Sequence, residues 1–234
     1  MKKTKIDWCD CTLNPVVGCK NGCEYCYARK INDRFHFVKD WSKPEYFKDK
    51  LEQIYHTKDR SIFMDSMSDI SWWTNSQIID VFHAISRNDQ NDYIFLTKGK
   101  ETESLHGFFN QLYAYRLVEG NTCIFVGLTV DKNSKTELLK IHDYDFLSIE
   151  PILEPIRLPQ EIKGVKLIII GAETGNREGK VVPKKEWIEN IVTYCDKNNI
   201  KVFMKSSLKE LMGAEFRQDE LIWKLKKQSN GENK

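Results

Sequence analysis

Residues 18–27 read GCKNGCEYCY and place Cys19, Cys23 and Cys26 in one short stretch. The spacing is Cys-x3-Cys-x2-Cys, with an aromatic residue directly before the third cysteine. Three thiolates can occupy three corners of a 4Fe–4S cluster, whereas the common electron-transfer clusters use four cysteines. One iron atom would then keep an open coordination position, which a reactive metal site needs and a structural site does not. The two glycines of the stretch suit a tight loop, because glycine adopts positive φ without steric penalty.

Two further cysteines, Cys9 and Cys11, open a different interpretation of the same region. Cysteines crowded into so short a segment indicate a metal site, and disulfides are not expected in a reducing compartment. A four-thiolate zinc knot could combine these two with Cys23 and Cys26, as a non-catalytic module that binds nucleic acid or protein. It leaves Cys19 without a role. Cys9 and Cys11 could equally form a separate metal site, form a redox pair or have no function.

The composition is that of a globular chain. With 234 residues, 41% of them hydrophobic, the protein can bury about 70% of its unfolded surface without a stapling metal. The formal net charge of +2 does not by itself indicate a nucleic-acid partner. Basic residues increase toward the C-terminus, and we interpret them as a solvated face or as a contact for a polyanion.

The sequence carries no recognisable targeting signal. Residues 1–10 are charged and lack the apolar run of a signal peptide. No stretch reaches the roughly 20 apolar residues that a helix needs to cross a bilayer. We therefore expect a cytoplasmic protein without a membrane partner.

Short apolar runs alternate with amphipathic segments through the rest of the chain. The runs are rich in Val, Ile, Phe and Leu, which is typical of strands buried on both faces. They predict strands at residues 12–18, 61–65, 93–97, 123–130, 145–150, 166–171 and 201–205. Apolar residues at helical spacing predict helices over 78–85, 105–112 and 187–195. Pro183 is expected to open the last helix, and Cys123 and Cys195 are expected to be buried thiols.

This alternation of strands and helices predicts an α/β fold with a parallel sheet and helices outside it. The connections between parallel strands are right-handed, so the sheet curls in one direction. A closed barrel of eight units usually takes about 250 residues, and this chain is shorter. We predict a partial (β/α)6-type, TIM-like barrel with mostly parallel strands and one additional C-terminal strand. It would form a single domain over residues 1–234, with a flexible tail from about residue 228.

The cysteine stretch and the expected barrel together resemble the radical S-adenosylmethionine (SAM) superfamily. Its signature is this cysteine spacing, with an aromatic residue before the last cysteine, in a loop after the first strand of a partial (β/α)6 barrel. From about residue 6 to residue 206 the chain is also similar to a phage-associated, radical SAM-like family of unknown function. The motifs that carry this similarity are Trp8, Asn14-Pro15, Gly18-Cys19, Cys23, Cys26-Tyr27-Ala28, Ser66-Met67-Ser68-Asp69, Leu96-Thr97-Lys98, Ser148-Ile149-Glu150-Pro151, Gly171-Ala172-Glu173-Thr174-Gly175 and Phe203-Met204-Lys205. That family usually has other residues where this chain has Cys9 and Cys11.

The resemblance implies a radical SAM enzyme with one 4Fe–4S cluster on Cys19, Cys23 and Cys26. SAM would bind the open iron through its own amino and carboxylate groups. An external one-electron donor of the flavodoxin or ferredoxin type would drive reductive cleavage of SAM to a 5′-deoxyadenosyl radical. The radical would abstract hydrogen from a substrate that the sequence does not identify. A nucleotide, a nucleic-acid base, a peptide and a small metabolite are all compatible, so nucleic acid is one of the expected partners.

The remaining site residues are expected at the carboxyl ends of the strands, where barrels of this type place their chemistry. By the resemblance, the segment with Ser66, Ser68 and Asp69 would hold the SAM amino group, and the backbone near Tyr25 and Tyr27 would meet adenine. Thr97, Lys98, Thr129 and Asp131 complete the predicted cofactor-binding set, and Glu150, Glu173 and Lys205 are the predicted catalytic residues. Any one of these side chains could instead be a loop polar group or a helix cap, since serine and aspartate are favoured at N-caps. The pair at 72–73, two tryptophans, could stack a nucleobase or pack in the core.

Overall fold

The computed structural model describes residues 1–223 apart from positions 2, 101, 120–122, 132–135 and 161. It is an α/β fold, and in the described residues seven strands form one sheet in the order β1-β4-β5-β6-β7-β8-β9. The pairs β1–β4, β4–β5, β6–β7, β7–β8 and β8–β9 are parallel. The chain divides into two compact units, Met1–Phe125 and Val126–Lys234, with the boundary inside β6.

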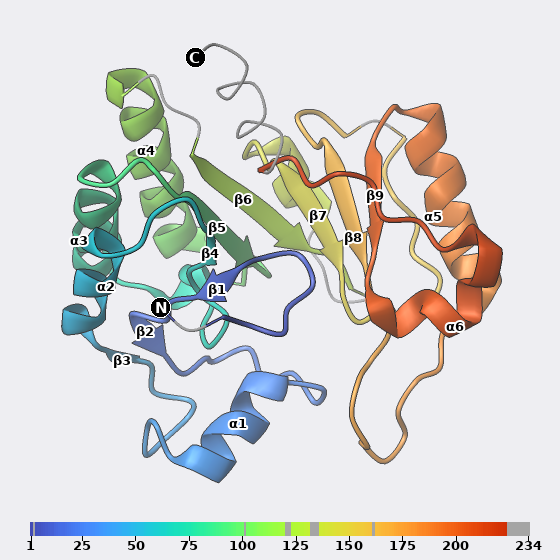
Figure 1. The fold of residues 1–234 in the computed structure, drawn as a ribbon, viewed down its shortest axis with the longest axis horizontal. Coiled ribbons are helices and arrows are strands. Elements are labelled where there is room, and N and C mark those ends of the chain that lie inside the picture. The colour runs from blue at the N-terminus through green and yellow to red at the C-terminus, as the bar shows by residue number, and fades with distance from the viewer. Residues whose placement is uncertain (2, 101, 120–122, 132–135, 161, 224–234) are drawn as a thin grey trace. The chain divides into compact units, whose positions relative to one another are not determined.

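The first unit contains three strands of the sheet and a separate two-stranded antiparallel sheet of β2 and β3 (Figure 1). Its strands are β1 (Cys11–Thr12), β2 (Val16–Val17), β3 (Glu45–Tyr46), β4 (Ser61–Phe63) and β5 (Asp92–Thr97), and its α-helices are α1 (Tyr27–Phe35), α2 (Glu52–Tyr55), α3 (Asn75–Ser86) and α4 (Thr102–Glu119). Two 3-10 helices, η1 (Lys48–Leu51) and η2 (Ile70–Trp72), join them. Phe108 of α4 packs edge-on against Phe82 of α3 and Phe95 of β5, with ring centroids 5.3 and 5.0 Å apart. These aromatic contacts hold α3 and α4 on the sheet.

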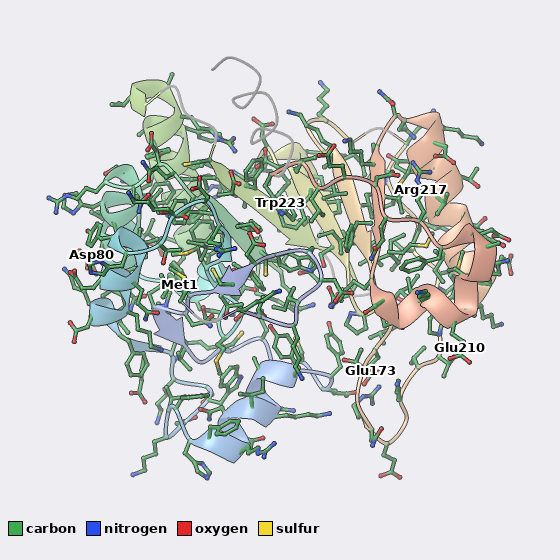
Figure 2. The ribbon with its side chains drawn as sticks, viewed as in Figure 1. Met1, Asp80, Glu173, Glu210, Arg217 and Trp223 are labelled. Carbon is green, nitrogen blue, oxygen red and sulfur yellow. The ribbon has the colours of Figure 1, made fainter. Side chains whose placement is uncertain are left out.

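The second unit is built on four parallel strands. They are β6 (Ile124–Thr129), which begins in the first unit, β7 (Phe146–Ile149), β8 (Leu167–Ile170) and β9 (Lys201–Met204), with α5 (Lys185–Lys197), α6 (Lys209–Met212), η3 (Thr136–Lys140), η4 (Ser206–Leu208) and η5 (Gly213–Glu215). Every residue of β8 is buried, as expected for a central strand covered on both faces. Trp223 packs against Phe146 of β7 with ring centroids 5.4 Å apart, and Figure 2 labels it.

Most of the elements expected from the sequence are confirmed. Six predicted strands correspond to β4 through β9, and the three predicted helices lie within α3, α4 and α5. Cys123 and Cys195 are buried, as expected. None of the described helices combines the length and the apolar character needed to span a membrane. The tail predicted from about residue 228 lies outside the described residues.

Two local expectations were wrong. Residues 12–18 are not one strand, because β1 ends at Thr12 and β2 pairs antiparallel with β3 in the separate two-stranded sheet. Pro15, which lies between β1 and β2, cannot donate to a ladder. Pro183 does not open α5, which begins at Lys185 after an extended N-cap residue.

Candidate functional site

The three cysteines of the Cys-x3-Cys-x2-Cys motif lie in the loop that leads from β2 to α1, which we call the cysteine loop (residues 18–26). None is in a disulfide, and all three are half-buried. Cys26 is the N-cap of α1, where its Sγ accepts a hydrogen bond from the backbone N–H of Arg29 at 3.4 Å. The N–H of Asn21 donates to Cys19 Sγ at 3.5 Å. Backbone donors therefore orient two of the three sulfur atoms.

The cysteine loop begins at a backbone position that only glycine can fill. Gly18 has a φ of +110°, and a Cβ there would lie 2.9 Å from both Pro44 Cα and the carbonyl oxygen of Trp41. On either side, the Gly18 N–H donates to the Met67 carbonyl at 2.9 Å and the Cys19 N–H donates to the Trp41 carbonyl at 2.8 Å. The start of the loop is therefore pressed against two distant segments of backbone.

The middle of the cysteine loop is held by one side chain, Asn21. Its amide nitrogen donates to Asp69 Oδ2 at 2.7 Å, and its amide oxygen accepts from the indole N–H of Trp72 at 2.6 Å. Both polar atoms of the amide are thus bonded to the segment that follows β4. We refer to Asn21, Asp69 and Trp72 as the loop anchor.

Asp69 is the centre of this anchor. Its carboxylate is buried and accepts three more hydrogen bonds, from Thr97 Oγ1 at 2.6 Å and from the N–H groups of Ser71 and Lys98 at 2.9 Å each. Asp69 therefore ties the cysteine loop to the carboxyl ends of β4 and β5. With four protein donors on its two oxygens, it acts here as a positioning residue.

The other predicted residues of the first unit gather at the same place. Tyr27 Oη donates to the Ser66 carbonyl at 2.9 Å, and Lys98 Nζ donates to Tyr25 Oη at 2.8 Å. Ser68 Oγ accepts from the indole N–H of Trp73, which is fully buried, at 3.1 Å. The structure thus brings the cysteine loop together with Tyr27, Ser66, Asp69, Thr97 and Lys98, whereas Ser68 contacts the core. Trp73 is core, whereas Trp72 belongs to the loop anchor.

The surroundings of Cys19 oppose ionisation of its thiol. Burial raises the pKa of the Cys19 thiol well above its usual range, and the carboxylate of Asp69 and the neighbouring Cys23 and Cys26 raise it further. A bound metal reverses such a shift, because it stabilises the thiolate and releases the proton. Three reduced thiols in one loop are the type of ligand that iron–sulfur clusters use.

The described residues contain no preformed site for a metal ion. Within the described residues, no three His, Cys, Asp or Glu side chains are grouped around one ion position. A single zinc would need its thiolates at about 2.3 Å from one centre, whereas the thiolates of a cubane bind different iron atoms and need not converge. Of the cysteines in the zinc alternative, Cys11 lies in β1, where its Sγ is 3.6 Å from Met1 Sδ.

Two of the predicted residues of the second unit form an ion pair with each other. Lys205 forms an ion pair with Glu150, next to Gly171, where a Cβ would lie 3.0 Å from Lys205 Cδ and 3.2 Å from Glu150 Cγ. The pair thus fills the space that the missing side chain leaves. Thr129 is buried at the end of β6 and Asp131 is half-buried just after it.

Glu173 has a partner that the sequence did not single out. Figure 2 labels Glu173 in the segment between β8 and α5; its buried carboxylate accepts from Arg177 Nε at 2.6 Å and Nη2 at 2.9 Å. This bidentate pair fixes the segment after β8. The two residues are four positions apart but not in a helix, so the sequence spacing does not indicate the pair.

The basic residues near the C-terminus are partly neutralised. Arg217, labelled in Figure 2, donates to Asp196 at 2.6 Å and to Asp219 at 2.9 Å. The lysines from residue 224 onward lie outside the described residues.

A second carboxyl group, Asp65, lies beside the loop anchor. It is buried at the end of β4 and accepts from the Leu96 N–H at 3.1 Å. Burial raises the pKa of Asp65 well above its usual range, and the negative charge of Asp69 adds to the shift. The folded protein therefore holds a proton on Asp65 at pH values where the unfolded chain has released it.

We expect the Asp65→Asn variant to gain stability relative to the wild type as pH rises. Above the unfolded pKa of about 3.9, wild-type stability falls by up to about 1.4 kcal/mol per pH unit until the raised folded pKa is passed. Asparagine has no proton to lose, so the stability of the variant does not fall with pH in this way. Urea unfolding at pH 5, 6 and 7 measures the difference.

Asp80→Asn is the matched control for that series. Lys48 and Tyr46 hydrogen-bond to Asp80 and lower its pKa, so its contribution is lost only as pH falls below about 3.9. The difference between this variant and the wild type should be constant from pH 5 to 7. Parallel curves for Asp65→Asn and the wild type would show that Asp65 is ionised in the folded state.

Comparison with known proteins gives one assignment. Searches of curated proteins and of solved structures found no match. The sequence pattern of one family, described as a protein of unknown function (DUF5131), matches residues 3–233. Because this match covers nearly the whole chain, the protein belongs to the DUF5131 family.

Proposed function

We propose that this protein is a radical SAM enzyme whose Cys19, Cys23 and Cys26 hold one 4Fe–4S cluster with an open iron for SAM. The observation that carries the proposal is the cysteine loop itself, in which three reduced, half-buried thiols are held at the carboxyl ends of β4 and β5 by the loop anchor. When bound, the cluster and SAM together supply reductive cleavage of SAM to a 5′-deoxyadenosyl radical, which abstracts hydrogen from the substrate.

The residues of the chain have distinct tasks in this proposal. Asn21 and Asp69 fix the loop so that its thiols are presented in one arrangement. The backbone donors to Cys19 and Cys26 orient their sulfur atoms. The proton of Cys19 leaves when the thiolate becomes a ligand, which makes loading dependent on pH.

Other parts of the proposal follow the resemblance. Ser66 and Ser68 would contact the SAM amino group directly. Asp69 would contribute indirectly, by holding Asn21 of the cysteine loop. Thr129 and Asp131 would meet the ribose, and the substrate would meet the Glu150–Lys205 pair. The sheet would be that of a partial (β/α)6 barrel, which the parallel pairing of its strands supports. A cytoplasmic location and a flavodoxin or ferredoxin donor complete the proposal.

The test is formation of 5′-deoxyadenosine. The full chain is reconstituted without oxygen using iron and sulfide, reduced with dithionite and mixed with SAM, and the products are separated by liquid chromatography. We expect 5′-deoxyadenosine and methionine in equal amounts, and none without reductant. A brown protein that binds iron through the three cysteines but never cleaves SAM would refute the radical chemistry. A colourless protein with stoichiometric zinc would support the zinc module instead.

A further inference from the structure

We infer that the outer face of α1 binds single-stranded nucleic acid next to the cysteine loop. This inference concerns a surface of the first unit and holds whether or not the loop carries a cluster. It rests on the exposure of apolar side chains, on the cations between them and on the place of α1 in the fold.

Exposed apolar side chains line one face of α1. Tyr27, Ile31 and Phe35 are 49%, 37% and 57% exposed, and their spacing of four places them on the same face of the helix. Phe37, 49% exposed just after the helix, extends this face with its ring centroid 5.8 Å from that of Phe35. We call these four residues, three of which are aromatic, the aromatic face. Single exposed apolar residues are ordinary, but a contiguous group marks a binding surface.

The opposite side of α1 explains why the helix is oriented this way. Ala28 and Asn32 are buried, and the side chain of Asn32 bonds both backbone groups of Val38, at 2.9 and 3.1 Å. These contacts fix the helix and the turn after it, so the aromatic face is held outward. Figure 1 shows α1 lying apart from the strands of the first unit.

Cations flank the aromatic face on the same side of α1. Lys30 and Arg34 are exposed and follow Tyr27 by three and seven positions, which puts them beside it on the helix. The guanidinium carbon of Arg34 lies 5.2 Å from the centroid of the Phe35 ring. The acidic residue of α1, Asp33, projects further round the helix. The surface therefore alternates flat rings with positive charge.

This alternation fits a single nucleic-acid strand better than a protein. Unpaired bases stack on aromatic rings regardless of sequence, while lysine and arginine contact the phosphates between them. Protein interfaces share the aromatic residues and the arginine but are depleted in lysine, so Lys30 is the residue that favours a nucleic-acid strand. Because Cys26 caps α1 and Tyr27 bonds to Ser66, a strand on this face would lead directly to the cysteine loop.

The experiment measures fluorescence anisotropy of labelled single-stranded DNA and RNA of mixed sequence, titrated with the full chain. We expect affinity to fall about tenfold between 50 and 200 mM salt, since two or three phosphates are contacted. The Phe35→Leu variant should bind about tenfold more weakly, because it keeps an apolar side chain but loses stacking. Phe35→Tyr should bind like the wild type. Lys30→Glu and Arg34→Glu should weaken binding and flatten the salt dependence.

The controls are an apolar and a basic residue outside the aromatic face. Leu117 of α4 is 86% exposed, so Leu117→Ala should leave binding unchanged, as should Lys58→Glu in the exposed turn before β4. Equal loss in Phe35→Leu and Phe35→Tyr, or equal loss in the controls, would overturn the inference. So would binding of the wild type to anionic vesicles but not to oligonucleotides, or a dimer that Phe35→Leu dissociates.

Discussion

Serine in place of Cys19, Cys23 or Cys26 is expected to reduce the iron bound after oxygen-free reconstitution to less than about a tenth of the wild-type amount. Iron–sulfur clusters are held by soft thiolate ligands, and a serine hydroxyl supplies neither the charge nor the softness at neutral pH. Each of the three cysteines comes from the same loop, so no second element can replace a missing ligand. Iron and sulfide analysis per chain, with the absorbance of the brown protein, measures the loss.

The controls use cysteines outside the motif. Cys195→Ala removes a fully buried thiol of α5, and it should keep the wild-type iron content. Cys9→Ala and Cys11→Ala should do the same, because the proposal gives them no ligand role. The zinc alternative requires the reverse pattern. Metal that survives Cys19→Ser but is lost with Cys9→Ala would contradict the cluster.

Alanine in place of Asp69 is expected to lower the free energy of unfolding by about 3–5 kcal/mol. The change leaves four donors without their acceptor, those of Asn21, Ser71, Thr97 and Lys98, and an unsatisfied buried donor costs about 1–3 kcal/mol. The Asp69→Asn variant should recover only part of this loss, because an amide nitrogen in place of one carboxylate oxygen cannot accept the hydrogen bonds made there.

Urea unfolding followed by tryptophan fluorescence measures this effect, since Trp72 and Trp73 lie beside Asp69 in the chain. The matched control is Asp80→Ala on α3, labelled in Figure 2, whose carboxylate accepts from Lys48 and Tyr46 at 2.8 and 3.0 Å. That site is partly exposed, so we expect a loss of about 1 kcal/mol or less. Equal losses in the two variants would mean that Asp69 is not the centre of the loop anchor.

The sheet could be predicted because its strands are short, apolar and bounded by polar residues. The run Leu167–Ile170 is the clearest case, since four consecutive branched apolar residues, three of them isoleucine, favour a short strand buried on both faces. The division of residues 12–18 between β1 and β2 could not be predicted in the same way. Val16–Val17 pairs with Glu45–Tyr46 across a long separation in sequence, which the local pattern does not encode.

The candidate site likewise has a part that the sequence determines and a part that only the tertiary structure determines. Its three thiols are local, because their spacing within one loop is a property of the sequence alone. What the tertiary structure decided is the environment of the loop: the contact of Asn21 with Asp69 and Trp72, and the fit of Gly18 against Trp41 and Pro44. Asp69 meets Thr97 and Lys98 because the carboxyl ends of the adjacent parallel strands β4 and β5 lie at one edge of the sheet. Sequence spacing specifies which ligands one loop can offer, whereas burial and long-range hydrogen bonds decide how they are held.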